Sequence, residues 1–297
     1  MPGFEELIRR FERSISILGR SASTFKNYSM HIAAIALHYG KTPIELDQEQ
    51  VHEYLFMLQK RSKTPSQTYF KHTVYGLRFL LKSEGLPYSY LHLPEIKKEN
   101  KLPVVLSKQE VWAMLKACTL LKHKVLIGLL YGCGLRCLEV RSIRLCDIDF
   151  DRGQLKVAQG KGKKDRYVPL SEHIIRGLKS YISAERPTYY LFGGVHIIDR
   201  AGTSVRGGDF DSRYSQKGVQ WAVKEAAKRA GILKDVHVHT LRHTCATHLL
   251  EDGMDIISVK NFLGHENIET TLLYLHVAQL NTKAIFSPLD TLFEQCR

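Results

Sequence analysis

Apolar residues recur at intervals of three and four along the first part of the chain, which is the spacing of one helix face. Asp47 opens the third of these stretches, and Gly85 closes the fourth. Four amphipathic helices with short connections can bury a common core. The pattern therefore predicts an N-terminal helical bundle over residues 1–86, with four apolar stripes: Leu7 to Leu18, Phe25 to Tyr39, Val51 to Leu58 and Phe70 to Leu81.

The helical pattern fails between residues 87 and 106. Proline blocks the continuation of a helix, and several lysines add positive charge to the same segment. We interpret residues 87–106 as a basic linker between two domains; a surface loop inside one domain is the alternative. The prolines and lysines are Pro87, Pro94, Pro103, Lys97, Lys98 and Lys101.

Residues 107–297 are expected to form a second domain, mainly helical with a small β-hairpin. Ser107 and Glu110 have the spacing of a capping box that opens a helix. Helical spacing then continues to Tyr131, where glycines interrupt it. Two short strands, joined by a glycine- and lysine-rich turn, predict the hairpin. The strands are residues 154–158 and 167–170, and helices are expected after Arg136, over 171–184, over 216–230, and after His237 with breaks at Gly253 and Gly264.

Charge indicates the class of partner. Lysine and arginine outnumber the acidic residues by 43 to 30, for a net charge of +13. Such an excess favours a polyanion, usually nucleic acid, over an acidic small molecule. No apolar run approaches the ~20 residues that span a bilayer, and residues 1–20 lack a signal-peptide core. We expect a cytoplasmic protein.

The cysteines match no metal site. They form no Cys-x-x-Cys pair, and their spacing fits no zinc template. We expect reduced, structural thiols, and neither a metal nor another cofactor. The six are Cys118, Cys133, Cys137, Cys146, Cys245 and Cys296.

The C-terminal part holds residue types suited to attack on a phosphodiester. His239 and Arg242 lie three residues apart, so on a helix they share one face. A guanidinium binds a planar anion through paired hydrogen bonds, an imidazole moves protons near neutral pH, and a phenol can act as a covalent nucleophile. His265 and Tyr274 follow in order, and Arg136 lies far upstream.

These residues, in this order, resemble the tyrosine recombinase (phage integrase) family from about residue 106 to 280. The segment Gly134-Leu135-Arg136 is similar to the first arginine box of that family, and residues 160–170 to its catalytic-lysine hairpin. His239-Thr240-Leu241-Arg242-His243 and Leu263-Gly264-His265 match the next two boxes, and Tyr274 the nucleophile position. Of these, His243 is expected to be structural or DNA-facing and not catalytic. The N-terminal bundle would then be the core-binding, SAM-like domain, and residues 107–297 the catalytic domain.

The resemblance assigns roles to the site. Arg136 and Arg242 would neutralise the charge of the transition state, and His239 would accept a proton from Tyr274. Lys161 would be the general acid for the leaving 5′-oxygen, with Lys163 as the alternative. His265 would bond the phosphate or position Tyr274, and Glu139 would orient Arg136 or simply pair with it.

The implied reaction cleaves and rejoins DNA strands through a 3′-phosphotyrosyl intermediate, for integration, excision or a related rearrangement of a mobile element. It needs no ATP or metal. The implied partners are double-stranded DNA recombination sites, in a homotetramer that holds two duplexes, with accessory DNA-bending proteins left open. A type IB topoisomerase-like relaxing enzyme and a non-catalytic DNA-binding protein of the same fold are the alternatives.

Other segments are expected to serve DNA binding or assembly. The loop over residues 193–215 is a candidate to contact DNA or a partner subunit. The apolar stripe within residues 289–293 would dock into a neighbouring subunit or pack on its own domain. Candidate phosphate contacts are Lys26, Lys71, Arg78, Lys163 and Lys164.

Overall fold

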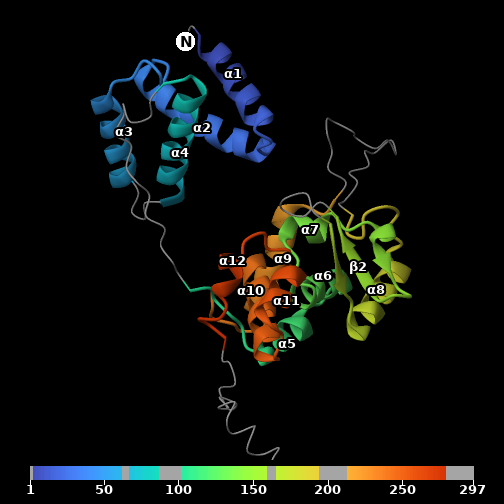
Figure 1. The fold of residues 1–297 in the computed structure, drawn as a ribbon. Helices are drawn as coiled ribbons and strands as arrows, with labels where there is room; N and C mark the ends of the chain where they lie inside the picture. The colour runs from blue at the N-terminus through green and yellow to red at the C-terminus, as the bar shows by residue number, and fades with distance from the viewer. Residues whose placement is uncertain (1–2, 62–66, 87–101, 159–164, 194–212, 279–297) are drawn as a thin grey trace, which may run out of the picture. The chain divides into compact units, whose positions relative to one another are not determined.

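The computed structural model describes residues 3–61, 67–86, 102–158, 165–193 and 213–278 (Figure 1). The chain divides into two compact units, Met1–Asn100 and Lys101–Arg297. The first consists of helices, and the second combines helices with a small sheet. The fold is therefore mainly helical, as the sequence predicts.

The first unit contains the four helices expected from the apolar stripes. Ser21 caps the second helix by accepting a hydrogen bond from the Thr24 backbone N–H at 3.3 Å. Asp47 does the same for the third, accepting from the Gln50 N–H at 2.8 Å. The helices are α1 (Phe4–Ile17), α2 (Ala22–Tyr39), α3 (Gln48–Arg61) and α4 (Gln67–Ser83).

Helices α2 and α4 contribute to both apolar clusters of the first unit, one shared with α1 and the other with α3. The two helices approach closely at Gly76, where a Cβ atom would lie 3.5 Å from the Tyr28 carbonyl oxygen. Phe11 of α1 is fully buried beside them. Leu18, the last member of the first predicted stripe, is 64% exposed because it lies just beyond the end of α1.

The second unit begins with the capping box that the sequence predicts. Ser107 Oγ accepts from the Glu110 N–H at 3.1 Å, and Glu110 Oε2 accepts from the Ser107 N–H at 2.7 Å. The sequence predicts helical spacing up to Tyr131, and the structure has two helices there. They are separated because Cys118 and Leu120 adopt extended backbone. These helices are α5 (Lys108–Ala117) and α6 (Leu121–Gly132).

The small sheet has three antiparallel strands in the order β1-β2-β3. Leu155 of β2 pairs with Ile148 of β1 and with Val168 of β3, so the buried positions of the central strand face the core. The sequence predicts the hairpin but not β1, since a strand of two residues has no recognisable alternation. The strands are β1 (Ile148–Asp149), β2 (Gln154–Val157) and β3 (Arg166–Pro169).

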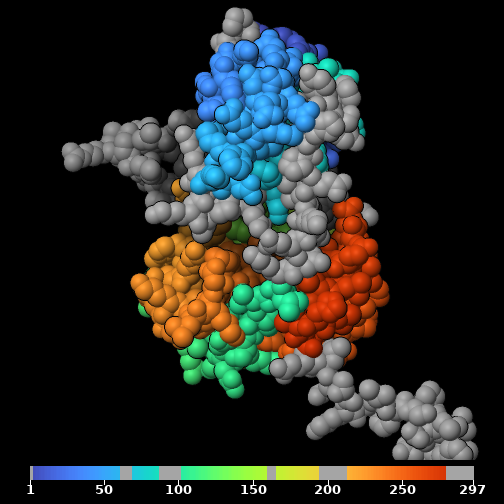
Figure 2. Space-filling view, turned by 90° about the vertical axis from the view of Figure 1, so that its left-hand side faces the viewer, coloured from blue at the N-terminus to red at the C-terminus, as the bar shows by residue number. Residues whose placement is uncertain are grey.

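The remaining helices pack around α6 and α10, and α10 is buried on almost every side. In Figure 1 the sheet and α8 lie at one side of the second unit, and α10 to α12 at the other. Figure 2 shows the face on which α5 lies between α9 and the C-terminal helices. These elements are α7 (Cys137–Arg141), α8 (Glu172–Glu185), α9 (Gln216–Arg229), α10 (Val238–Glu251), α11 (Ile256–Leu263) and α12 (Glu269–Leu272).

Candidate active site

Helix α10 carries three of the polar residues of the site. It begins after His237, whose backbone N–H donates to Thr240 Oγ1 at 3.0 Å. His239, Arg242 and His243 then fall on neighbouring positions of one helical face. His239 is exposed, His243 is half-buried, and Arg242 is 3% exposed. The helix therefore presents a row of groups that runs from the surface into the interior.

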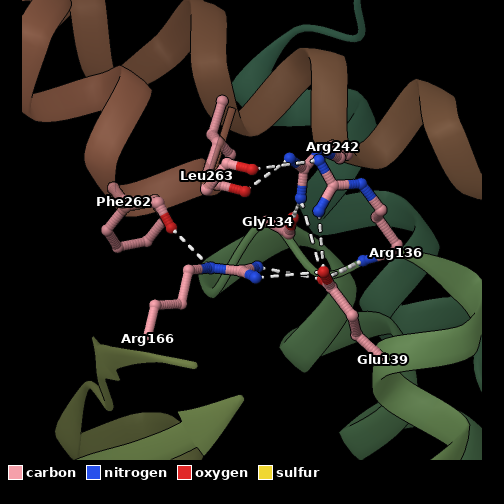
Figure 3. A network of polar contacts seen from close by, with 8 residues as sticks. Gly134, Arg136, Glu139, Arg166, Arg242, Phe262 and Leu263 are labelled. Carbon is pink, nitrogen blue, oxygen red and sulfur yellow. Dashed lines mark hydrogen bonds and ion pairs between the residues drawn. The ribbon is translucent and has the colours of Figure 1, made fainter. Parts of the chain in front are cut away.

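Arg242 connects three separate segments of the chain. Its Nη1 donates to the Gly134 carbonyl, and its Nη2 donates to the Leu263 carbonyl at 2.6 Å (Figure 3). Gly134 has a φ of +57°, and a Cβ atom there would lie 2.6 Å from a Leu263 methyl group. Glycine is needed at this position for both its backbone conformation and its size. Arg242 therefore fixes the segments before Arg136 and His265 against α10.

Glu139 is the common acceptor for the arginines around it. Its carboxylate accepts from Arg136 Nη1 at 2.7 Å and from the Arg136 backbone N–H at 2.8 Å. Arg166 donates to both carboxylate oxygens, at 3.0 and 2.9 Å, and Arg242 Nη1 lies 3.8 Å away. Burial by itself would raise the pKa of Glu139, but the hydrogen bonds and charges of Arg166 and Arg136 outweigh it and lower the pKa to about 2. Glu139 therefore stays ionised.

Arg166 is a site residue that the sequence analysis does not single out. It lies at the start of β3, and besides Glu139 it donates from Nε to the Phe262 carbonyl at 3.0 Å (Figure 3). Its side chain is 11% exposed. The signal in the sequence is weak, because Arg166 is one of several basic residues in the hairpin segment and only its strand position distinguishes it. It ties the hairpin to α7 and to the end of α11.

His265 follows the C-terminal end of α11, where Gly264 adopts the left-handed conformation at φ +64°. Its Nδ1 lies 2.8 Å from Thr271 Oγ1, and both residues are buried. Burial, followed by the charges of Arg242, Arg136 and Arg166, lowers the pKa of His265 to about 3. The imidazole is therefore neutral near pH 7.

Tyr274 is 2% exposed and packs among apolar residues of α10 and α11. Its hydroxyl lies 3.0 Å from His243 Nδ1, and its ring stacks on His265 with centroids 6.1 Å apart. Burial raises the pKa of Tyr274, while the charges of Arg242 and Arg136 act in the opposite direction. The phenol therefore sits in a cationic, largely desolvated environment.

The site has an excess of positive charge. Arg136, Arg166 and Arg242 surround the single carboxylate of Glu139. Partial desolvation, followed by the charges of Arg242 and Arg136, also lowers the pKa of the exposed His239. The excess arginine charge favours a bound anion, because an anion would compensate it.

The structure brings together five of the six predicted catalytic residues: Arg136, His239, Arg242, His265 and Tyr274. Lys161, with Lys163 and Lys164, lies outside the described residues. Val157 and Arg166 pair on either side of that segment, so it connects adjacent ends of β2 and β3.

The other predicted contact residues belong to the first unit. Lys26 is exposed on α2, whereas Lys71 and Arg78 are half-buried on α4. Most of the loop 193–215 and the tail segment 289–293 lie outside the described residues. Within the part of the chain that the structure describes, no helix combines the length and the apolar character needed to cross a membrane.

Comparisons with known proteins give one consistent result. A model of the phage integrase family matches residues 104–280. A tyrosine recombinase of Thermosipho africanus is 33% identical over 290 residues, which cover 92% of this chain and 96% of that protein. Tyrosine recombinase XerA of Thermococcus kodakarensis is 31% identical and covers 92% of this chain and 91% of its own length.

Two solved structures are similar in fold. The XerH site-specific recombinase bound to a palindromic difH substrate has a TM-score of 0.67 at 21% identity, covering 86% of this chain and 76% of that one. The Tn1549 transposon integrase in complex with transposon right end DNA has a TM-score of 0.63 at 17% identity, covering 97% and 98%. Both likenesses extend over most of the chain.

Proposed function

This chain belongs to the phage integrase family and is a site-specific tyrosine recombinase that cleaves and rejoins DNA, and we propose that Tyr274 is its nucleophile. Family membership selects the recombinase over the topoisomerase-like and non-catalytic alternatives. The observation that carries the proposal is the convergence of Tyr274, two imidazoles and two arginines from four segments of the chain on one buried, cationic site.

The chemistry requires that a neutral phenol become an effective nucleophile. A free tyrosine ionises only near pH ~10, so the site must accept its proton or favour the phenolate. In the reaction Tyr274 Oη attacks the phosphorus of a DNA phosphodiester, a 3′-phosphotyrosyl bond forms, and the bond to the 5′-oxygen breaks. A 5′-hydroxyl from a partner duplex reverses the step and joins new strands.

Arg136 and Arg242 are proposed to stabilise the charge of the transition state. Arg242 is held by two carbonyl groups and is 3% exposed, so its position is fixed before substrate arrives. The Arg136 side chain is 21% exposed and its Nη2 bonds the Gly264 carbonyl at a long 3.3 Å. Arg136 is therefore the guanidinium better able to turn a donor toward the phosphate.

Lys161 is proposed as the general acid that protonates the leaving 5′-oxygen, with Lys163 as the alternative. The described flanks support this assignment, since Arg166 anchors the start of β3 to Glu139 and thus to Arg136. His239 is a candidate acceptor of the Tyr274 proton, and His265 is proposed to bond the phosphate or to position Tyr274. Glu139 orients Arg136 by accepting from both its side chain and its backbone.

The proposed partner is a duplex recombination site, on which four copies hold two duplexes. Supporting this, the similar XerH and Tn1549 integrase structures were solved with their DNA substrates. Residues 1–86 would be the core-binding domain, joined by the basic linker 87–106 to the catalytic domain of residues 107–297, and the two domains would grip the DNA together. Candidate phosphate contacts are Lys26, Lys71 and Arg78 in the first unit and Lys163 and Lys164 in the second.

Covalent trapping tests the proposal. The purified full-length protein is mixed with a library of nicked duplexes, and DNA that remains bound after denaturation is recovered and sequenced. Wild-type protein should yield an adduct enriched in one sequence, and Tyr274→Phe should yield none. Tyr189→Phe, which changes an exposed tyrosine outside the hairpin, is the matched control and should form the adduct normally. An undiminished adduct with Tyr274→Phe would overturn the assignment.

A further inference from the structure

The hydroxyl of Tyr274 contacts an imidazole that the sequence analysis does not place in the site. Tyr274 Oη lies 3.0 Å from His243 Nδ1, and the two ring centroids are 5.6 Å apart at 50°. The residues are 31 positions apart in sequence and come from α10 and from the segment that follows α12. The turns between α10, α11 and α12 bring them together.

Two imidazoles on α10 are candidates to accept the tyrosine proton. His239 lies one turn earlier, is exposed, and has its ring centroid 6.3 Å from that of His243. His243 is half-buried and lies directly against the reacting oxygen. Among the described residues, His243 is the one whose side chain hydrogen-bonds the Tyr274 hydroxyl. Geometry therefore favours His243 over His239 for direct proton transfer.

We infer that His243 takes the proton of the Tyr274 hydroxyl while that oxygen attacks the scissile phosphate. The inference rests on the proposed role of Tyr274 as nucleophile. In the resting site the His243 proton is on Nε2, and Tyr274 donates its hydrogen bond to Nδ1. During attack the Oη–P bond forms and the Tyr274 proton moves to Nδ1. The bond from phosphorus to the 5′-oxygen breaks, and that oxygen keeps the bonding pair and takes a proton from Lys161, the proposed general acid. Rejoining returns the proton to Tyr274.

Burial and the surrounding charges keep His243 neutral and available as a proton acceptor. Burial first, and then His239 and Arg242 of its own helix, lower the pKa of His243 to about 4. Tyr274 and His265 face it from the C-terminal segment. The imidazole is therefore neutral at pH 7 and can accept. A DNA phosphate would add negative charge beside it and raise its pKa, so the base strengthens when substrate binds.

Single-turnover cleavage tests this role on a nicked duplex that carries the sequence recovered by trapping. His243→Asn keeps an acceptor oxygen near the Nδ1 position but cannot take the proton, and His243→Phe removes both functions. We expect both variants to bind the duplex with unchanged Kd and to cleave it ~100-fold or more slowly, the usual contribution of a general base. His248→Asn changes another histidine of α10, which bonds Tyr131 instead, and should cleave at the wild-type rate.

A sulfur-substituted substrate separates the base from the acid. Sulfur in place of the leaving 5′-oxygen needs no proton to depart, so it should rescue a Lys161→Ala variant and leave His243→Asn slow. The wild-type rate should fall as the pH is lowered and His243 becomes protonated, and His243→Asn should lose that dependence. Cleavage by both His243 variants within threefold of wild type, or rescue of His243→Asn by sulfur, would overturn the inference.

A measurement on the free protein tests the contact without DNA. In the full-length protein with ¹⁵N-labelled histidine, Tyr274→Phe should shift the ring nitrogen signals of His243 more than those of His239. A shift at His239 with His243 unchanged would refute the inference even if the variants at His243 failed to fold. Loss of adduct with Tyr274→Phe alongside fast cleavage by His243→Asn would leave the proposed nucleophile intact and reject only His243.

Discussion

Replacing Arg166 with methionine should destabilise the catalytic unit, because Arg166 is the main partner of a buried carboxylate. Glu139 and Arg166 have side chains only 5% and 11% exposed, and two hydrogen bonds join them. The pKa of Glu139, about 2 against an ordinary 4.5, corresponds to about 3 kcal/mol of stabilisation from all its partners. Arg136 still pairs with Glu139 in the variant, so we expect a loss of about 2 kcal/mol, below the usual ~3–5 kcal/mol for breaking a buried pair.

The effect of Arg166→Met on the free energy of unfolding should depend on pH. Because folding lowers the pKa of Glu139, its contribution is complete above pH 4.5 and disappears as the pH falls toward 2. In Arg166→Met the pKa of Glu139 rises toward its ordinary value, so less stability remains to be lost in acid. The difference in unfolding free energy between wild type and variant should therefore shrink between pH 4.5 and 2.

Urea unfolding followed by tryptophan fluorescence measures this difference. Both tryptophans of the chain, Trp112 and Trp221, belong to the second unit, so the signal reports on that unit. Arg152→Met, at an exposed turn position beside β2, is the matched control and should unfold like wild type. An Arg166→Met midpoint equal to that of wild type at pH 7, or a difference that stays constant down to pH 2, would refute the reasoning.

Three further substitutions test local parts of the account. Thr271→Val removes the hydrogen bond to His265 Nδ1 and should slow single-turnover cleavage with about 1 kcal/mol of destabilisation in urea; an unchanged rate would contradict the positioning of His265. Gly134→Ala should cost at least about 2 kcal/mol, because its Cβ would overlap Leu263 in a left-handed residue; wild-type thermal unfolding would contradict this. Arg186→Gly should stabilise by up to about 1 kcal/mol, since Arg186 has a φ of +45° at the end of α8; a lower Tm would oppose it.

Local signals predict much of the fold. The Ser107–Glu110 capping box and the Asp47 cap are found where the sequence places them, because both depend on residues three apart. Strand β1 is not predictable in this way: its two residues are defined by pairing with β2. Residues 118 to 120, where α5 ends and α6 begins, contain neither proline nor glycine. Elements set by tertiary pairing therefore escape pattern analysis.

The same difference between local signals and tertiary contacts applies to the active site. Five of the predicted catalytic residues lie together in the structure. They could be identified from the sequence because they occur in motifs that follow one another in a characteristic order. Arg166 and His243 were missed, since each acts through a partner far away in sequence: Glu139 is 27 positions from Arg166, and Tyr274 is 31 from His243. A basic residue in a hairpin and a histidine on a helix can be assigned to the site only when the structure shows which distant residue each one contacts.

The most direct test of the central claim is to identify the residue that carries DNA in the trapped adduct. The adduct is digested with protease and nuclease, and the peptide that retains a nucleotide is sequenced by mass spectrometry. The account predicts a single modified peptide with the nucleotide attached to Tyr274 through its 3′-phosphate. Attachment to any other residue, or through a 5′-phosphate, would contradict it.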